Sequence, residues 1–156
     1  MINKNAIEIF VVLMINLIFN QEIEYVIYTD QTLIEAANTL SDFYKYEIDD
    51  DYKLNTKIII DDTLTIPIND WISNELSINS NLEYLLILGD ETIIPPIYYG
   101  INSSTPSDDY YSSSTLSNST PPIPTLKTGR IIVNNSIKAN ESINKIKTYV
   151  LNGDNE

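Results

Sequence analysis

The feature of this 156-residue sequence that most constrains its fold is a short apolar run that ends abruptly. Tyr84–Leu88 reads YLLIL, and Gly89-Asp90 follows at once. An unbroken apolar run with a glycine stop is typical of a central strand in a parallel sheet, buried on both faces. In open α/β sheets the working groups lie beyond the carboxyl ends of such strands. The sequence therefore predicts a functional site at this edge.

Four carboxylates downstream of the run are the candidate ligands of a substrate or a cation: Asp90, Glu91, Asp108 and Asp109. Calcium is the cation that hard oxygen ligands clustered in a loop would suit. For Asp108 and Asp109 a structural role and a cation-binding role are equally expected, with one side chain inward and one outward in an extended chain. We interpret Gly89-Asp90 first as a strand end, in which the aspartate accepts hydrogen bonds from the following amides.

Four further residues are expected to build the structure around this edge. Of Tyr110 and Tyr111, we expect one to be packed and one exposed. Gly129 is expected to permit a close approach or an unusual backbone angle, and Arg130 to pair with nearby carboxylates. Together with Gly89, these residues form the predicted structural motif.

The rest of the chain alternates between predicted strands and helices. Strands are predicted at 24–28, 57–60 and 129–133 from short runs rich in β-branched and aromatic residues. A capping box of Thr32 and Glu35 begins one predicted helix, a second follows Pro67 with Trp71 in the core, and a third covers Ala139 to Val150. Residues 101–124 are rich in Ser, Thr, Asn and Pro and are predicted to be a long loop. This order predicts an α/β fold with a parallel sheet.

Composition narrows the possible functions. With 9 basic and 22 acidic residues the net charge is −13, which argues against nucleic acid and anionic membranes as partners. The sequence has no Cys and no His. It therefore contains no disulfide, no thiolate metal site, no cysteine nucleophile and no histidine base.

Residues 1–20 have the pattern of a secretory signal peptide, because a Lys near the start precedes an apolar run too short for a typical membrane span. We expect residues 21–156 to form the mature domain of a secreted protein, without a membrane span. A buried first strand or helix is the alternative for this segment.

Four stretches, in this order, resemble the gingipain family of cysteine peptidases: LLILGDETIIPP, SDDYYSS, PTLKTGRIIVNN and NKIKTY. The resemblance covers roughly residues 22–151. It implies a three-layer, caspase-like parallel sheet flanked by helices, incomplete at the C-terminus. It also implies that the chain is the N-terminal part of a secreted or cell-surface bacterial gingipain-like cysteine endopeptidase, with a peptide or protein substrate.

Two departures from the family pattern concern catalysis. The family's catalytic His and Cys lie after the Gly-Arg strand and its helix, and neither residue type occurs here. The resemblance therefore implies that these residues alone are inactive. Family members also tend to carry an acidic residue four places before the Gly of Gly-Arg, where this sequence has Thr125. An acidic rim would suit basic substrate side chains, as in the Arg- and Lys-specific members.

Two alternatives belong to other functional classes. One is a non-catalytic secreted α/β domain that binds a partner or a cation. The other is a receiver-like domain, which Asp61, Asp62 and Asp90 loosely suggest, although no later strand ends in a suitably placed Lys.

Overall fold

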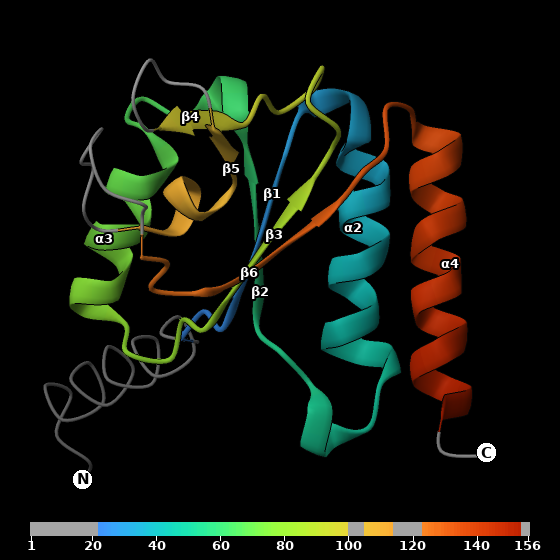
Figure 1. Cartoon of the computed structure of the whole chain (residues 1–156). Helices are drawn as coiled ribbons and strands as arrows, with labels where there is room; N and C mark the ends of the chain where they lie inside the picture. Colours follow the sequence, from blue (N-terminus) through green and yellow to red (C-terminus); the bar gives the residue numbers. More distant parts are fainter. Residues whose placement is uncertain (1–21, 100–104, 114–122, 154–156) are drawn as a thin grey trace, which may run out of the picture.

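Four parallel strands form the central sheet of the protein (Figure 1). The computed structural model describes residues 22–99, 105–113 and 123–153, so the predicted signal peptide lies outside the described residues. The sheet has the order β2-β1-β3-β6, where the strands are β1 (Tyr25–Thr29), β2 (Thr56–Ile60), β3 (Tyr84–Leu88) and β6 (Lys127–Ile131). The predicted central strand is confirmed as β3, which lies between two neighbours. Because all the pairings are parallel and in register, the four carboxyl ends share one edge.

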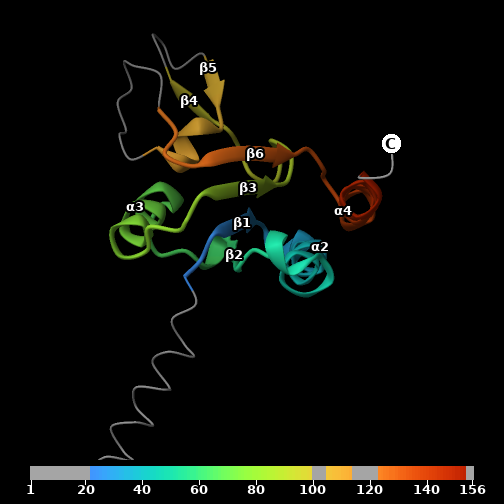
Figure 2. The same ribbon diagram turned by 90° about the horizontal axis from the view of Figure 1, so that it is seen from below.

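Helices and short segments cover both faces of the sheet (Figure 2). Helices α2 (Ile34–Asp42) and α4 (Ser136–Asn152) lie on one side, and α3 (Ile68–Ile78) lies on the other. Leu86 and Leu88 of β3 belong to the hydrophobic cluster under α2 and α4, whereas Leu85 and Ile87 belong to the cluster under α3. Because successive side chains of β3 point to opposite faces of the sheet, this strand contributes residues to both hydrophobic cores. The three-layer α/β prediction is confirmed.

Short helical turns connect these elements. They are η1 (Gln31–Leu33), η2 (Phe43–Glu47), η3 (Asp50–Tyr52) and η4 (Asp61–Thr63). None of the helices in the described part of the chain is long and apolar enough to cross a membrane.

The helix start predicted at Thr32 is wrong. Asp30, directly after β1, is the N-cap of η1, the turn that leads into α2. Its carboxylate accepts a hydrogen bond of 2.8 Å from the backbone N–H of Thr32. Asp30 has the extended backbone that an N-cap requires, with φ −103° and ψ 161°. Thr32 already lies inside the first turn, so its side chain cannot cap that turn.

A small hairpin interrupts the predicted loop between residues 101 and 124. Strand β4 (Ile97–Tyr99) pairs antiparallel with β5 (Thr105–Ser107), and the turn η5 (Asp109–Ser112) follows. Two three-residue strands, one of them with a central proline, give no alternating pattern that the sequence could reveal. The remaining parts of the predicted loop, 101–104 and 114–122, lie outside the described residues.

Candidate functional site

The turn after β3 is built by a glycine and an aspartate. Gly89 has a φ of 148°, and a Cβ there would lie 3.1 Å from Cγ2 of Ile93. Asp90 is 8% exposed, and its carboxylate accepts hydrogen bonds from the backbone N–H of Thr92 at 3.0 Å and from its hydroxyl at 2.6 Å. These bonds hold the pKa of Asp90 below its ordinary value. Asp90 thus closes the turn, as expected for a strand end.

Arg130 joins three segments at this edge. Its guanidinium donates Nε–H to Oδ2 of Asp108 at 2.8 Å and Nη2–H to Oδ1 at 2.6 Å. Its Nη1 donates to the carbonyl oxygens of Gly89 at 2.8 Å and Ile94 at 2.9 Å. The Arg130 side chain is 11% exposed. The expected pairing of Arg130 with a carboxylate is present, and it ties β6 to the β3 turn and to the segment before η5.

The other three candidate carboxylates differ in how accessible they are to a ligand. Both oxygens of Asp108 face Arg130, so this carboxylate is occupied by a fork-shaped ion pair. Asp109 is exposed at the start of η5, and its backbone N–H donates to the hydroxyl of Ser107 at 3.1 Å. Glu91 is exposed and lies with Asp108 and Arg130 around a hollow of about 270 Å³. Within the described residues, no group of three acidic side chains is placed to hold a metal ion.

The prediction for the two tyrosines of η5 is wrong. Tyr110 and Tyr111 are both buried, with 1% and 6% of their surface exposed. They occupy consecutive positions of a tight helical turn, where neighbouring side chains do not alternate as in a strand. The hydroxyl of Tyr111 donates to the carbonyl oxygen of Pro95, and burial raises the pKa of Tyr111 to about 12.

The prediction for Gly129 is also wrong. Gly129 is a regular residue of β6, without positive φ, and a Cβ there would meet no atom of the described residues within 4 Å. The space over Gly129 belongs to a hollow of about 340 Å³ beside Tyr25, Tyr84 and Lys127. At Gly129 there is space for a side chain, whereas the positive φ of Gly89 requires a glycine.

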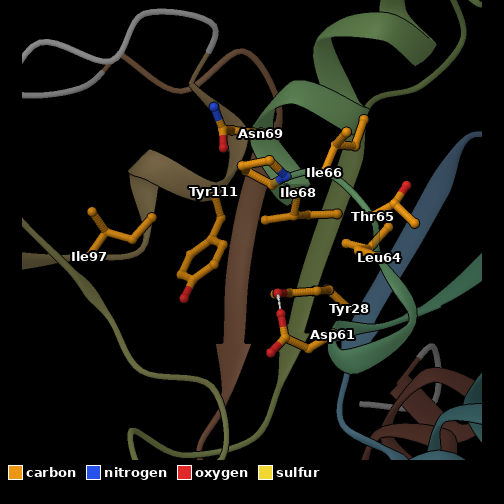
Figure 3. A pocket seen from close by; sticks show the side chains of 10 residues that line it. Tyr28, Asp61, Leu64, Thr65, Ile66, Ile68, Asn69, Ile97 and Tyr111 are labelled. Atoms are coloured by element: carbon orange, nitrogen blue, oxygen red, sulfur yellow. Dashed lines mark hydrogen bonds between the residues drawn. The ribbon is translucent and has the colours of Figure 1, made fainter.

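Sequence reasoning missed a larger hollow at the same edge of the sheet (Figure 3). Its volume is about 440 Å³, and it lies between the segment after β2, the start of α3, β4 and η5. Tyr28 and Asp61 lie at one end of it, and the hydroxyl of Tyr28 donates to Oδ1 of Asp61. Burial and this bond raise the pKa of Tyr28. The signal was present in the sequence: Asp61 directly follows a predicted strand whose carboxyl end lies at this edge.

The fold and the site together define the class of protein: a three-layer α/β domain whose polar groups lie at the carboxyl edge of a parallel sheet. The sequence model of peptidase family C25 matches residues 19–156. The chain belongs to peptidase family C25, the gingipain family. A search of curated proteins finds no match.

Two solved structures share the fold. The complex of pro- and mature domains of RgpB from Porphyromonas gingivalis aligns with a TM-score of 0.61 and 18% identity, over 81% of this chain and 29% of that chain. A structure described as a protease aligns with a TM-score of 0.60 and 15% identity, over 84% of this chain and 29% of that chain. The chain therefore spans 29% of the length of each solved chain. These likenesses establish the gingipain, caspase-like fold.

Proposed function

We propose that these 156 residues form the N-terminal part of an exported gingipain-like cysteine endopeptidase domain and have no peptidase activity by themselves. The observation that carries the proposal is the combination of membership in peptidase family C25 with a sequence that contains neither Cys nor His. A cysteine peptidase requires a thiolate, a base that activates it and donors for the oxyanion. The residues present can shape a substrate cleft, but the thiolate and the imidazole would have to come from other residues.

Lys127 and Lys145, the lysines considered as substitute bases, do not form a dyad with Ser112. Lys127 donates from Nζ to Glu83 at 2.7 Å at the surface, and Lys145 is exposed on α4. The hydroxyl of Ser112 lies 2.6 Å from that of Thr128 and is buried. Lys127 is paired with a carboxylate and Lys145 is exposed, so neither lysine is positioned as the base of a catalytic serine.

The substrate in this proposal is a peptide or protein whose basic side chains approach the acidic edge of the sheet. Of the candidate carboxylates, Glu91 and Asp109 are exposed there and are available to a ligand. Asp108 supports this edge through Arg130, and Asp90 supports it through the turn. Glu91 and Asp109 are also the two exposed carboxylates at which calcium would bind. The assay is therefore carried out with and without calcium.

The test is an assay of purified 1–156 with fluorogenic peptides cleaved after Arg or Lys, with and without calcium. We expect no turnover, and we expect cleavage by a longer polypeptide that joins this domain to a His and a Cys, abolished by Cys→Ala. Turnover by 1–156 that disappears on substituting Lys127 or Lys145 would contradict the proposal. A longer polypeptide that binds peptides without cleaving them would favour a secreted binding or scaffold domain.

Export of the protein is tested by a separate experiment. We propose that residues 1–20 direct secretion and are removed, leaving residues 21–156 as the domain. Mass spectrometry of the exported protein is expected to find an N-terminus near residue 21. An intact Met1 on the exported protein would contradict this part of the proposal.

A further inference from the structure

The hollow over Gly129 lies at the amino end of the sheet, at the opposite edge from Asp61 and Asp90. The first residues of β1, β3 and β6 are adjacent there, because Tyr25 pairs in register with Tyr84, and Tyr84 with Lys127. The hollow has a volume of about 340 Å³, within the range of small-ligand sites, roughly 300–1,000 Å³. No part of the proposed function uses it.

Gly129 keeps this part of the sheet open. It is an exposed residue of β6, next to Leu86 of β3, and a Cβ at Gly129 would meet no atom of the described residues within 4 Å. Leu54 and Leu86 give the hollow apolar surface. A ligand that entered over Gly129 would remove this surface from water, which is favourable for an apolar group.

Three tyrosine rings also line the hollow. The rings of Tyr25 and Tyr44 have centroids 5.4 Å apart at an interplanar angle of 85°, and those of Tyr25 and Tyr84 have centroids 6.2 Å apart at 79°. Both pairs meet edge to face, the geometry that aromatic rings prefer over a parallel sandwich, at separations of about 4.5–7 Å. A further planar ring can join this cluster in the same way, whereas a saturated ring of equal size gains only apolar contact.

The charges around the hollow favour a neutral ligand. Lys127 is the one charged group among the described residues that line it, and its Nζ donates to Glu83 at 2.7 Å and lies 4.6 Å from the centre of the Tyr84 ring. An anion would compete with Glu83 and approach a chain of net charge −13, and a cation would meet Lys127. Burial raises the pKa of Tyr25 and of Tyr44, so both phenols stay uncharged at neutral pH.

We propose that this hollow binds a small, uncharged molecule with a planar aromatic ring, which lies over Gly129 and contacts the rings of Tyr25 and Tyr84. This ligand differs from the proposed peptide substrate in its charge and in its position on the sheet. The site requires no catalytic residue, so it stands whether or not the domain is part of a peptidase.

The test uses the full 156-residue chain and four probes, each with one six-membered ring and one substituent: benzyl alcohol, cyclohexylmethanol, benzoate and benzylamine. Binding is measured at neutral pH by NMR, from the ring signals of Tyr25 and Tyr84 and the amide signal of Gly129. We expect benzyl alcohol to bind about threefold more tightly than cyclohexylmethanol, because only an aromatic ring gains the edge-to-face contacts. We also expect it to bind more tightly than either charged probe.

Three outcomes of this titration would overturn the proposal. Equal affinity for benzyl alcohol and cyclohexylmethanol would mean that the hollow accepts any apolar ring. Tighter binding of benzoate or benzylamine would contradict the preference for a neutral ligand. Unchanged signals at Tyr25, Tyr84 and Gly129 would place the probes elsewhere.

Two glycine variants with the same substitution locate the site. Gly129→Leu fills the hollow and is expected to weaken benzyl alcohol about tenfold, because the added side chain occupies the space of the ligand. Gly153→Leu adds the same side chain at the end of α4, where a Cβ also meets no atom of the described residues within 4 Å, and is expected to leave the affinity unchanged. Neither glycine has a positive φ, so neither substitution strains the backbone. Equal losses in the two variants, or no loss in Gly129→Leu, would refute the site.

Substitutions of Tyr84 separate ring recognition from apolar contact. Tyr84→Leu is expected to weaken benzyl alcohol about threefold and to leave cyclohexylmethanol unchanged, whereas Tyr84→Phe retains the ring and should retain both affinities. Equal weakening of the two probes by Tyr84→Leu would mean that this side chain acts only as apolar surface, and would refute the aromatic preference.

Discussion

At the scale of single residues, Arg130 is the side chain on which most of the carboxyl edge depends. Its four hydrogen bonds reach Asp108 and the carbonyl oxygens of Gly89 and Ile94. Lysine keeps the charge but cannot present a planar fork, so Arg130→Lys leaves some of these buried acceptors unpaired. We expect the free energy of unfolding to fall by about 1–3 kcal/mol, measured by urea denaturation. Lys145→Met, on the exposed face of α4, is the control, and an equal loss there would contradict this role of Arg130.

Asp90 gives the same edge a dependence on pH. Its pKa in the folded protein lies below the ordinary value of 3.8, because Thr92 donates hydrogen bonds to the carboxylate. A lowered pKa means that the charged form stabilises the fold above pH 3.8, and that this contribution is lost as the pH falls through the lowered value. Urea midpoints of the wild type and Asp90→Asn should therefore differ most at neutral pH and converge in acid. A difference that grows in acid would refute the assignment.

At the scale of elements, the end of β3 and the middle of β6 test what glycine does in this fold. Gly89→Ala places a Cβ 3.1 Å from Ile93 at a φ of 148°, so we expect a loss of about 1–3 kcal/mol in the free energy of unfolding. Gly129→Ala meets no atom of the described residues and should leave stability unchanged or raise it by up to about 1 kcal/mol. Equal effects in the two variants, compared by thermal and urea unfolding, would contradict this distinction.

The same elements show how far the sequence alone could lead. Strand β3 was predictable because burial on both faces leaves an unbroken apolar run, and the helices were predictable from their apolar faces. The hairpin β4–β5 was not, because strands of three residues carry no period. The roles of Tyr110, Tyr111 and Gly129 depend on tertiary packing and on φ, neither of which local sequence encodes. Asp61 was visible as a strand-end residue, but its pairing with Tyr28 from the neighbouring strand required the sheet order.

At the scale of the whole molecule, the main electrostatic feature is the excess of negative charge. The chain carries 22 acidic and 9 basic residues. The ion pairs of the described residues are few, and that between Arg130 and Asp108 is the most shielded. Exposed pairs contribute little to stability, so repulsion between the remaining carboxylates is the larger electrostatic effect.

This imbalance predicts how salt changes stability. Raising NaCl from about 0.05 M to about 0.5 M shortens the Debye length severalfold and screens repulsion between carboxylates more than it weakens the shielded pair of Arg130 and Asp108. We therefore expect the urea midpoint to rise with salt at pH 7, where the net charge is −13. The rise should be much smaller near pH 4.1, the isoelectric point, because the net charge there approaches zero. Sucrose at equal osmolality controls for solvent exclusion and should act alike at both pH values. A midpoint that falls with salt at pH 7 would mean that attractive pairs outweigh repulsion in this fold.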